Sequence, residues 1–335
     1  MIRRLARRLA WSFFVVWAVA SVAFVLNNVI PGDPARLIAG PQARVSDLER
    51  VRADLGLDRP LATQYARFMR RLAHPGAWTF DPKTDREHAS CAALIPGLHV
   101  DLGRSYTLRQ PVVKILAERI PRTLVLALVA VVLQVGLGLV AGVIAARRRN
   151  TFVDYAAVGG SLLGISAPTF LIGVGLQFVF AYKLHVLPKD GYGESFAQHA
   201  AGIVLPALTL GIFGAAYYTR LIRDEMIGLM KQDYVRTARA KGLSEGAVVV
   251  RHALRNALVP LVTVIGLDLG GLVGGAVVTE SIFRWPGLGA LSVTALLNRD
   301  GPVIIGTVIV TSSAIVFMNL VVDLCYAGLD PRVRS

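Results

Sequence analysis

Two carboxylates, Asp268 and Glu280, lie within an otherwise uncharged apolar stretch that runs from Ala257 to Phe283. A carboxylate near the middle of a bilayer costs about 2.5–3.5 kcal/mol on insertion scales, so it has to face a polar cavity or a partner. We expect Asp268 to line a substrate path and to interact there with cationic or amine groups. A hydrogen bond to Ser or Thr on a neighbouring span is the alternative. Glu280 is a second candidate for the path, although its place nearer the end of the stretch also fits simple hydration.

A second place for chemistry is the polar, basic segment from Asp233 to Pro260, which separates two apolar runs. Its residue preferences predict a helix, a left-handed turn at Gly242 and a second helix capped by Ser244. The second helix carries an apolar face with a basic rim. Such an element could lie on anionic lipid headgroups or could dock a protein partner, and its own spacing fits both functions equally.

Residue patterns of the common catalytic and cofactor sites are absent from the sequence. There is no Gly-x-x-x-x-Gly-Lys-Ser/Thr phosphate loop, because no Gly is followed by Lys. His-Glu-x-x-His, Gly-x-Ser-x-Gly and Cys-x-x-Cys are also missing. The two cysteines, Cys91 and Cys325, are too few for a disulfide framework. We therefore expect no enzyme activity, metal or cofactor in this chain, and any ATP chemistry has to come from another one.

Hydrophobic residues make up 54% of the 335 residues, which indicates a membrane protein rather than a soluble domain. Six stretches are long enough to cross a bilayer, which takes roughly 20 apolar residues. The sequence thus predicts an all-α polytopic membrane protein with six transmembrane helices. We expect Pro168 to kink the third span and the fourth to begin near Gly202. The six stretches are Leu9–Gly32, Thr123–Ala146, Tyr155–Tyr182, Ser195–Thr219, Ala257–Phe283 and Gly301–Val322.

The basic residues are distributed by membrane side. If the N-terminus is cytoplasmic, the inner segments hold seventeen Lys and Arg, whereas the two short outer loops hold four. This asymmetry predicts that both termini, and the segment 233–260, face the cytosol. It also accounts for the net charge of +14 without nucleic-acid binding, which we do not expect. The first span ends without a cleavage pattern, so we expect a retained signal anchor.

The long outer segment between the first two spans is expected to be helical where its pattern is periodic. Ser46-Asp-Leu-Glu49 has the form of a capping box for a helix that ends near Gly56. A second, amphipathic helix follows from Leu61, and a third starts at Pro111. Between them, His74–Val100 is polar and rich in Pro and Gly, and an irregular loop is expected. These helices could pack on the mouth of a pore or receive a partner.

Small residues recur along the fifth span at a spacing that permits close helix approach or a sliding interface. They are Gly266, Gly270, Gly271, Gly274 and Gly275. The aromatic, turn-rich segment that follows, Phe283–Gly289, suits a short re-entrant element.

Seven motifs in order along the chain resemble one family, the inner-membrane permease subunits of ATP-binding-cassette importers. The resemblance is to the first permease of the dipeptide/oligopeptide/nickel subgroup. The motifs are Pro31-Gly-Asp-Pro34 with Leu55-Gly-Leu-Asp-Arg-Pro-Leu61, Asp101-Leu-Gly-Arg-Ser-Tyr106, Asp233-Tyr-Val-Arg-Thr-Ala-Arg-Ala-Lys-Gly-Leu243, His252-Ala-Leu-Arg-Asn-Ala257, Thr279–Gly289 and Leu329-Asp-Pro-Arg-Val-Arg334.

The resemblance implies a type I ABC importer permease fold. Residues 1–30 would form the cytoplasmic N-terminus and first helix, 31–111 the extracytoplasmic segment, 112–327 the permease domain and 328–335 a cytoplasmic tail. It further implies a pore shared with a second permease, two cytosolic ATPases that bind ATP and Mg, and an extracytoplasmic solute-binding protein. The coupling residues seated on the ATPase would be Arg236, Thr237, Ala238, Lys241, Gly242, Leu243 and Ser244.

On this basis we expect a subunit that imports di- or oligopeptides by alternating access. The alternatives are nickel or another solute of the same family, or an ion-coupled secondary transporter that uses Asp268. Two departures from the family pattern stand out. The segment 74–100 looks like an insertion, and Asp268 occupies a position where relatives commonly carry an uncharged polar residue, often Gln.

Overall fold

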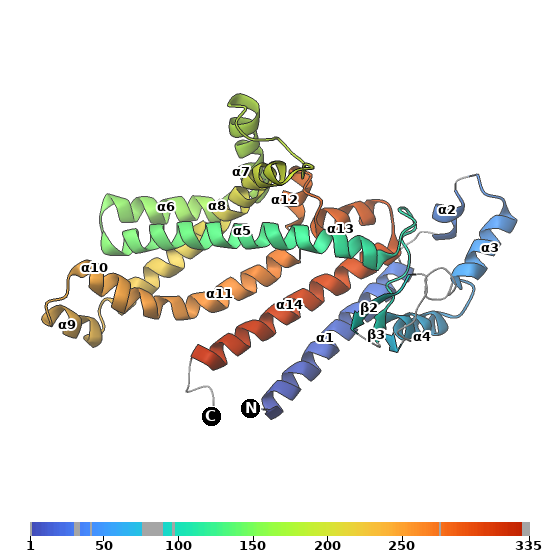
Figure 1. The fold of residues 1–335 in the computed structure, drawn as a ribbon, viewed down its shortest axis with the longest axis horizontal. Helices are drawn as coiled ribbons and strands as arrows, with labels where there is room; N and C mark the ends of the chain where they lie inside the picture. Colours follow the sequence, from blue (N-terminus) through green and yellow to red (C-terminus); the bar gives the residue numbers. More distant parts are fainter. Residues whose placement is uncertain are drawn as a thin grey trace. The chain divides into compact units, whose positions relative to one another are not determined.

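The computed structural model describes residues 2–29, 34–40, 42–75, 90–95, 98–274 and 276–329. Within these residues, four helices are long and apolar enough to cross a membrane, and the number rises to six if each of two bent helix pairs is one span. These six elements correspond to the six predicted spans. The chain divides into two compact units, Met1–Arg122 with Gly287–Ala314, and Thr123–Pro286 with Ile315–Ser335. Figure 1 follows the chain through both.

The first unit contains the long helix α1 (Ile2–Val29) and three shorter helices: α2 (Pro34–Ala39), α3 (Val45–Leu55) and α4 (Leu61–Leu72). Helix α3 ends as predicted, because Gly56 takes the left-handed conformation with φ of 68° and its N–H bonds the carbonyl of Ala53. The predicted capping box is wrong. The helix begins one residue before Ser46, and its N-cap, Arg44, makes no side-chain cap hydrogen bond.

A small antiparallel sheet stands where the sequence predicted an irregular loop. Its strands are β1 (His74–Pro75), β2 (Ala92–Ile95) and β3 (Leu98–Val100), in the order β1-β3-β2. His74 lies opposite His99 in this sheet. Strands of two to four residues are too short to show an alternating pattern, so sequence periodicity could not reveal them. Residues 76–89, also part of the predicted loop, lie outside the described chain.

The core of the first unit forms where α5 (Val112–Arg147) begins. Val112, Ile115 and Leu116 are buried against α13 (Leu288–Leu297) and the start of α14 (Gly301–Leu329). The third outer helix is not separate, since α5 runs unbroken past Pro121 into the second span. Nearby, the buried Asp300 accepts hydrogen bonds from the Ser105 hydroxyl at 2.5 Å and from the backbone N–H groups of Tyr106 and Thr107.

The third span of the second unit is broken rather than kinked. Helices α6 (Phe152–Ser166) and α7 (Thr169–Leu176) meet at 101°, and α7 continues as the π-helical segment η2 (Gln177–Lys183). Pro168 forces this break because the residue before a proline avoids helical geometry, and Ala167 is extended with ψ of 127°.

Helix α8 (Phe196–Leu229) begins six residues before the predicted Gly202. Its start is fixed by a capping box, in which the Ser195 hydroxyl accepts the Gln198 N–H and the Gln198 side chain accepts the Ser195 N–H. A helix of 34 residues is roughly 50 Å long, so α8 extends well past the thickness of a bilayer.

Glycines let α5 and α6 pack closely on α8. A Cβ at Gly142 of α5 would lie 2.7 Å from the carbonyl oxygen of Thr219, and one at Gly164 of α6 would lie 2.8 Å from the Cβ of Ala216. Neither position can accept a larger residue without movement of backbone, so the three helices form a tightly packed group.

The remaining elements of the second unit are α9 (Asp233–Ala240), α10 (Glu245–Ala247), the π-helical segment η3 (Val248–Leu254), α11 (Arg255–Val273) and α12 (Val277–Ile282). The predicted close approach of the fifth span is confirmed at two glycines. Gly266 and Gly270 of α11 face Val322 and Met318 of α14, whereas a Cβ at Gly271 would meet nothing within 4 Å. Phe283 and Trp285 are buried in the turn that leads to α13.

Candidate functional site

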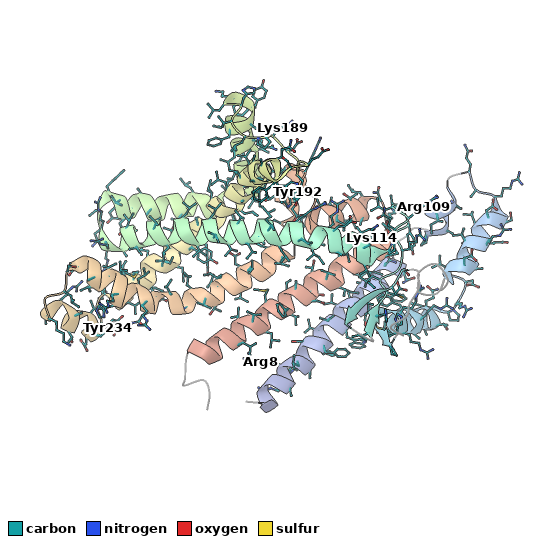
Figure 2. The ribbon with its side chains drawn as sticks, viewed as in Figure 1. Arg8, Arg109, Lys114, Lys189, Tyr192 and Tyr234 are labelled. Atoms are coloured by element: carbon teal, nitrogen blue, oxygen red, sulfur yellow. The ribbon has the colours of Figure 1, made fainter. Side chains whose placement is uncertain are left out.

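The basic segment 233–260 folds as the sequence predicted. Helix α9 ends at Ala240, Gly242 takes the left-handed conformation with φ of 79°, and the Ser244 hydroxyl accepts the Ala247 N–H. After the role that the family resemblance implies for the segment 233–260, we call α9, the turn 241–244 and the helix from α10 to Leu254 the coupling element. It lies beyond the ends of α8 and α11, and Tyr234 marks it in Figure 2.

A small apolar core makes the coupling element a defined structure. Val235 and Ala238 of α9 are buried against Val248 of η3, with Met230 packed beside them. Across the turn, Arg239 forms an ion pair with Glu245 at 2.7 Å between Nε and Oε1. That hydrogen bond raises the pKa of Arg239 above its usual value. These contacts hold α9 against η3, and Val249 and Ala253 of η3 pack in turn on Tyr218, Ile222 and Met226 of α8.

The predicted coupling residues do not all face outward. Ala238 is 4% exposed and belongs to the small core, so any role it has is to shape α9. Thr237 is exposed but its hydroxyl donates to the carbonyl of Asp233 at 2.9 Å. The side chain of Arg236 is 73% exposed. The other exposed candidates are Lys241, Gly242, Leu243 and Ser244.

Asp268 is held by two side chains that the sequence analysis did not identify. Its Oδ2 atom accepts a hydrogen bond from the Tyr218 hydroxyl of α8 at 3.2 Å and another from the Gln134 amide of α5. Both partners are buried, whereas Asp268 itself is half-buried. The interhelical alternative named Ser or Thr as partners, and the structure supplies an amide and a phenol instead.

A signal for one of these partners was present in the sequence. Gln134 is the one polar side chain between Leu124 and Ala146, and such a residue inside a span is expected to face protein rather than lipid. The glycine at 214 in α8 gives it room, because a Cβ there would collide with the Gln134 side chain. The pairing of Tyr218 with Asp268, fifty residues apart, could not be read from spacing.

Glu280 is buried, although its position near the end of the span suggested that it would be hydrated. It is fully buried in α12, and its Oε1 atom accepts a hydrogen bond from the Thr123 hydroxyl of α5 at 2.9 Å. The interpretation that Glu280 is simply hydrated is therefore wrong. The structure thus places the two path candidates with separate partners, Asp268 with Gln134 and Tyr218, and Glu280 with Thr123.

Comparison with known proteins then decides the family. Residues 138–335 match the model of the binding-protein-dependent transport system inner membrane component, and residues 1–127 match its N-terminal companion. The chain belongs to this family of binding-protein-dependent permeases. The predicted resemblance is confirmed, and the protein is a permease subunit of an ABC importer.

Relatives cover the permease from end to end. A putative peptide transport system permease protein of Brucella abortus (strain 2308) is 40% identical over 332 residues, which is 98% of both chains. A glutathione transport system permease protein of Escherichia coli (strain K12) is 38% identical over 334 residues, with 100% of this chain and 99% of that one aligned.

A solved structure shares the fold of this permease. One chain of the MetNI methionine ABC transporter, in an inward-facing conformation, aligns with a TM-score of 0.54 and 17% identity. The alignment covers 66% of this chain and 98% of that one. The predicted type I importer fold is confirmed by this match together with the family.

Proposed function

We propose that this permease moves small peptides into the cytoplasm, and that separate ATPases drive it through the coupling element. The observation that carries the proposal is the coupling element itself. It is a compact hairpin with its own core, it presents exposed candidate residues around Gly242, and its two ends continue directly into α8 and α11.

The connection to Asp268 supports a role in coupling. Helix α8 carries Tyr218, and α11 carries Asp268, so the two helices that leave the coupling element meet again at that hydrogen bond. A movement of the element would change the relation of these two helices. Such a rearrangement is what alternating access requires of a pore lined by rigid helices.

A peptide substrate is supported by the relatives and by the charge of Asp268. Two relatives with nearly full coverage are named for peptide and glutathione transport. The α-amino group of a peptide is cationic at neutral pH, and a half-buried carboxylate suits it. We therefore propose that Asp268 contacts the substrate amine during passage, while Glu280 supports the path from its buried contact with Thr123.

The proposed assembly follows from the family. A second permease would complete the pore, two ATPases would bind ATP and Mg, and an extracytoplasmic binding protein would deliver the peptide. The asymmetry of Lys and Arg, seventeen against four, supports a plasma-membrane orientation with both termini and the coupling element in the cytoplasm.

Uptake of a labelled dipeptide by the complete complex, reconstituted in proteoliposomes, tests the proposal. We expect accumulation that requires ATP on the side of the coupling element and is unaffected by collapse of ion gradients. Accumulation that follows an ion gradient and ignores ATP would instead support the secondary transporter that uses Asp268.

A further inference from the structure

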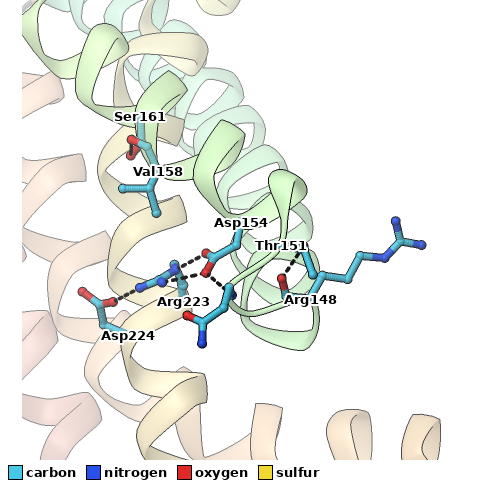
Figure 3. Close-up of polar contacts among 8 residues, drawn as sticks. Arg148, Thr151, Asp154, Val158, Ser161, Arg223 and Asp224 are labelled. Carbon is cyan, nitrogen blue, oxygen red and sulfur yellow. Dashed lines mark hydrogen bonds and ion pairs between the residues drawn. The ribbon is translucent and has the colours of Figure 1, made fainter.

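Arg223 of α8 forms an ion pair with the buried carboxylate of Asp154, and the proposed function does not involve this pair. Its Nε atom lies 2.5 Å from Oδ1 of Asp154 in α6, and its Nη2 atom lies 2.9 Å from Oδ2. The Asp154 side chain is only 2% exposed. Two parallel hydrogen bonds of this kind fix both distance and orientation, which a single contact cannot do. Figure 3 shows the pair.

The same carboxylate fixes the turn that joins α5 to α6. Oδ2 of Asp154 also accepts the backbone N–H of Asn150 at 2.9 Å. Asn150 has φ of 60°, in the left-handed region where a non-glycine residue needs local support. In the same turn the Thr151 hydroxyl donates to the carbonyl of Arg148 at 2.5 Å. Asp154 therefore ties this turn to α8.

A second carboxylate on the same guanidinium provides a natural comparison. Asp224 accepts from Nη1 of Arg223 at 2.8 Å, but its side chain is 59% exposed. Exposed pairs contribute little, because water and salt screen them. A buried pair loses much of its attraction to desolvation, so its main contribution is to geometry rather than to stability. Asp154, not Asp224, is thus the carboxylate that can set the position of Arg223.

Arg223 lies on α8 between Tyr218, which bonds Asp268, and the coupling element. Five residues earlier on the same helix, Tyr218 bonds Asp268. Three residues later, Met226 is fully buried in the cluster that includes Val249 of η3. After Leu229 only three residues separate α8 from α9. A displacement of the coupling element that travels along α8 passes Arg223 before it reaches Tyr218, the residue of α8 that bonds Asp268; α11 is the other route.

We propose that Asp154 and Arg223 are positioning residues that make the α5–α6 turn and the end of α8 move as one body when the ATPases act on the coupling element. Without the pair, the end of α8 bends locally and the displacement is lost before Tyr218. This inference rests on the proposed coupling role of residues 233–254, and it adds the residues that transmit the movement.

Transport per ATP hydrolysed measures this transmission in the reconstituted complex. We expect Asp154→Asn and Arg223→Lys to keep ATP hydrolysis within about twofold of wild type while transport per ATP falls about tenfold. Lysine keeps the charge but cannot form the two parallel bonds. Asp224→Asn, which alters the exposed carboxylate on the same guanidinium, is the matched control and should leave the ratio unchanged.

If wild type and both variants transport the same amount of peptide per ATP hydrolysed, the proposal is overturned. A parallel loss of hydrolysis, transport and assembled complex in both variants also overturns it, because that is the result of a merely structural pair. If Asp154→Asn does not assemble, Arg223→Lys carries the test. Failure of the proposed function is distinguishable, since then the wild-type complex itself shows no ATP-dependent transport.

Spin labels give a second, direct measurement. Phe152 and Lys231 are exposed on either side of the pair and can be replaced by Cys, with Cys91 and Cys325 changed to Ser. In the otherwise wild-type complex we expect the distance between the labels to stay constant when ATP binds. In Arg223→Lys it should change with ATP. If the distance between the labels stays constant in both complexes, or changes with ATP in both, the result contradicts motion as one body.

Discussion

At the scale of single residues, the structure shows that Asp268 is a hydrogen-bonded carboxylate. Its carboxylate has partners within the membrane span, because Tyr218 and Gln134 both donate a hydrogen bond to one of its oxygens. Its side chain is half-buried, and we propose that it contacts the substrate amine. A charged hydrogen bond of this kind contributes roughly 1.5–3 kcal/mol.

Replacement of Asp268 by Asn should therefore change selectivity. We expect uptake of a dipeptide with a free amino terminus to fall about tenfold, which corresponds to about 1.4 kcal/mol. Uptake of the same dipeptide with an acetylated amino terminus should change much less, because it brings no cation. Asp268→Glu keeps a carboxylate at this position and serves as the control. Equal reduction for both peptides would show that Asp268 has a structural role only.

Sequence reasoning could find Asp268, Gly242 and Ser244, because each stands out locally by its charge, its conformational freedom or its capping ability. It could not find the partners of Asp268, and it misjudged Glu280. Glu280 is buried and accepts a hydrogen bond from Thr123, a residue 157 positions away, and no local pattern carries such a contact. The Asp154–Arg223 pair was missed for the same reason.

At the scale of elements, the coupling element combines a fixed core with an exposed surface. Helix α9 places Ala238 against Val248 and leaves Ala240 exposed two residues later. The two alanines have the same intrinsic preference for helix, so they differ only in their surroundings.

These two alanines provide a paired test of the element's core. Ala238→Leu overfills the contact with Val248 and should destabilise the protein by about 1–3 kcal/mol. Ala240→Leu adds the same atoms on the surface and should change stability by no more than about 0.5 kcal/mol. The apparent melting temperature of the purified subunit in detergent checks both. Similar melting temperatures for the two variants would mean that Ala238 is not packed as described.

Elements with a long periodic pattern were predicted well, whereas the capping box expected at Ser46 is absent and the one at Ser195 was missed. The failures have physical causes. Helix α4 and the turn at Gly56 follow from local residue preferences. The sheet of β1, β2 and β3 is too short to carry a pattern. At Pro168 the sequence marks the position of the bend, but the angle of 101° depends on packing that the sequence does not display.

At the scale of the whole molecule, hydropathy predicted a polytopic membrane protein with six spans, and the resemblance of the motifs predicted a permease. The family confirms the fold and the class of transporter. Orientation is proposed from the distribution of Lys and Arg, the partners from the family, and the substrate from the names of the relatives. They converge on one claim, that an ATPase engages the permease at the turn around Gly242. The alternative is that the basic surface of this element binds lipid headgroups.

Binding of the ATPase to variants at Gly242 tests that claim most directly. A Cβ at this position meets nothing within 4 Å, so substitution alters the exposed surface rather than the core. Gly242→Asn tolerates the left-handed φ of 79° and is the control, whereas Gly242→Arg adds a bulky cation at the proposed contact. Both permease variants should still insert into the membrane. We expect the ATPase to co-purify with the Asn variant and to be lost from the Arg variant, and undiminished co-purification with the Arg variant would contradict the account.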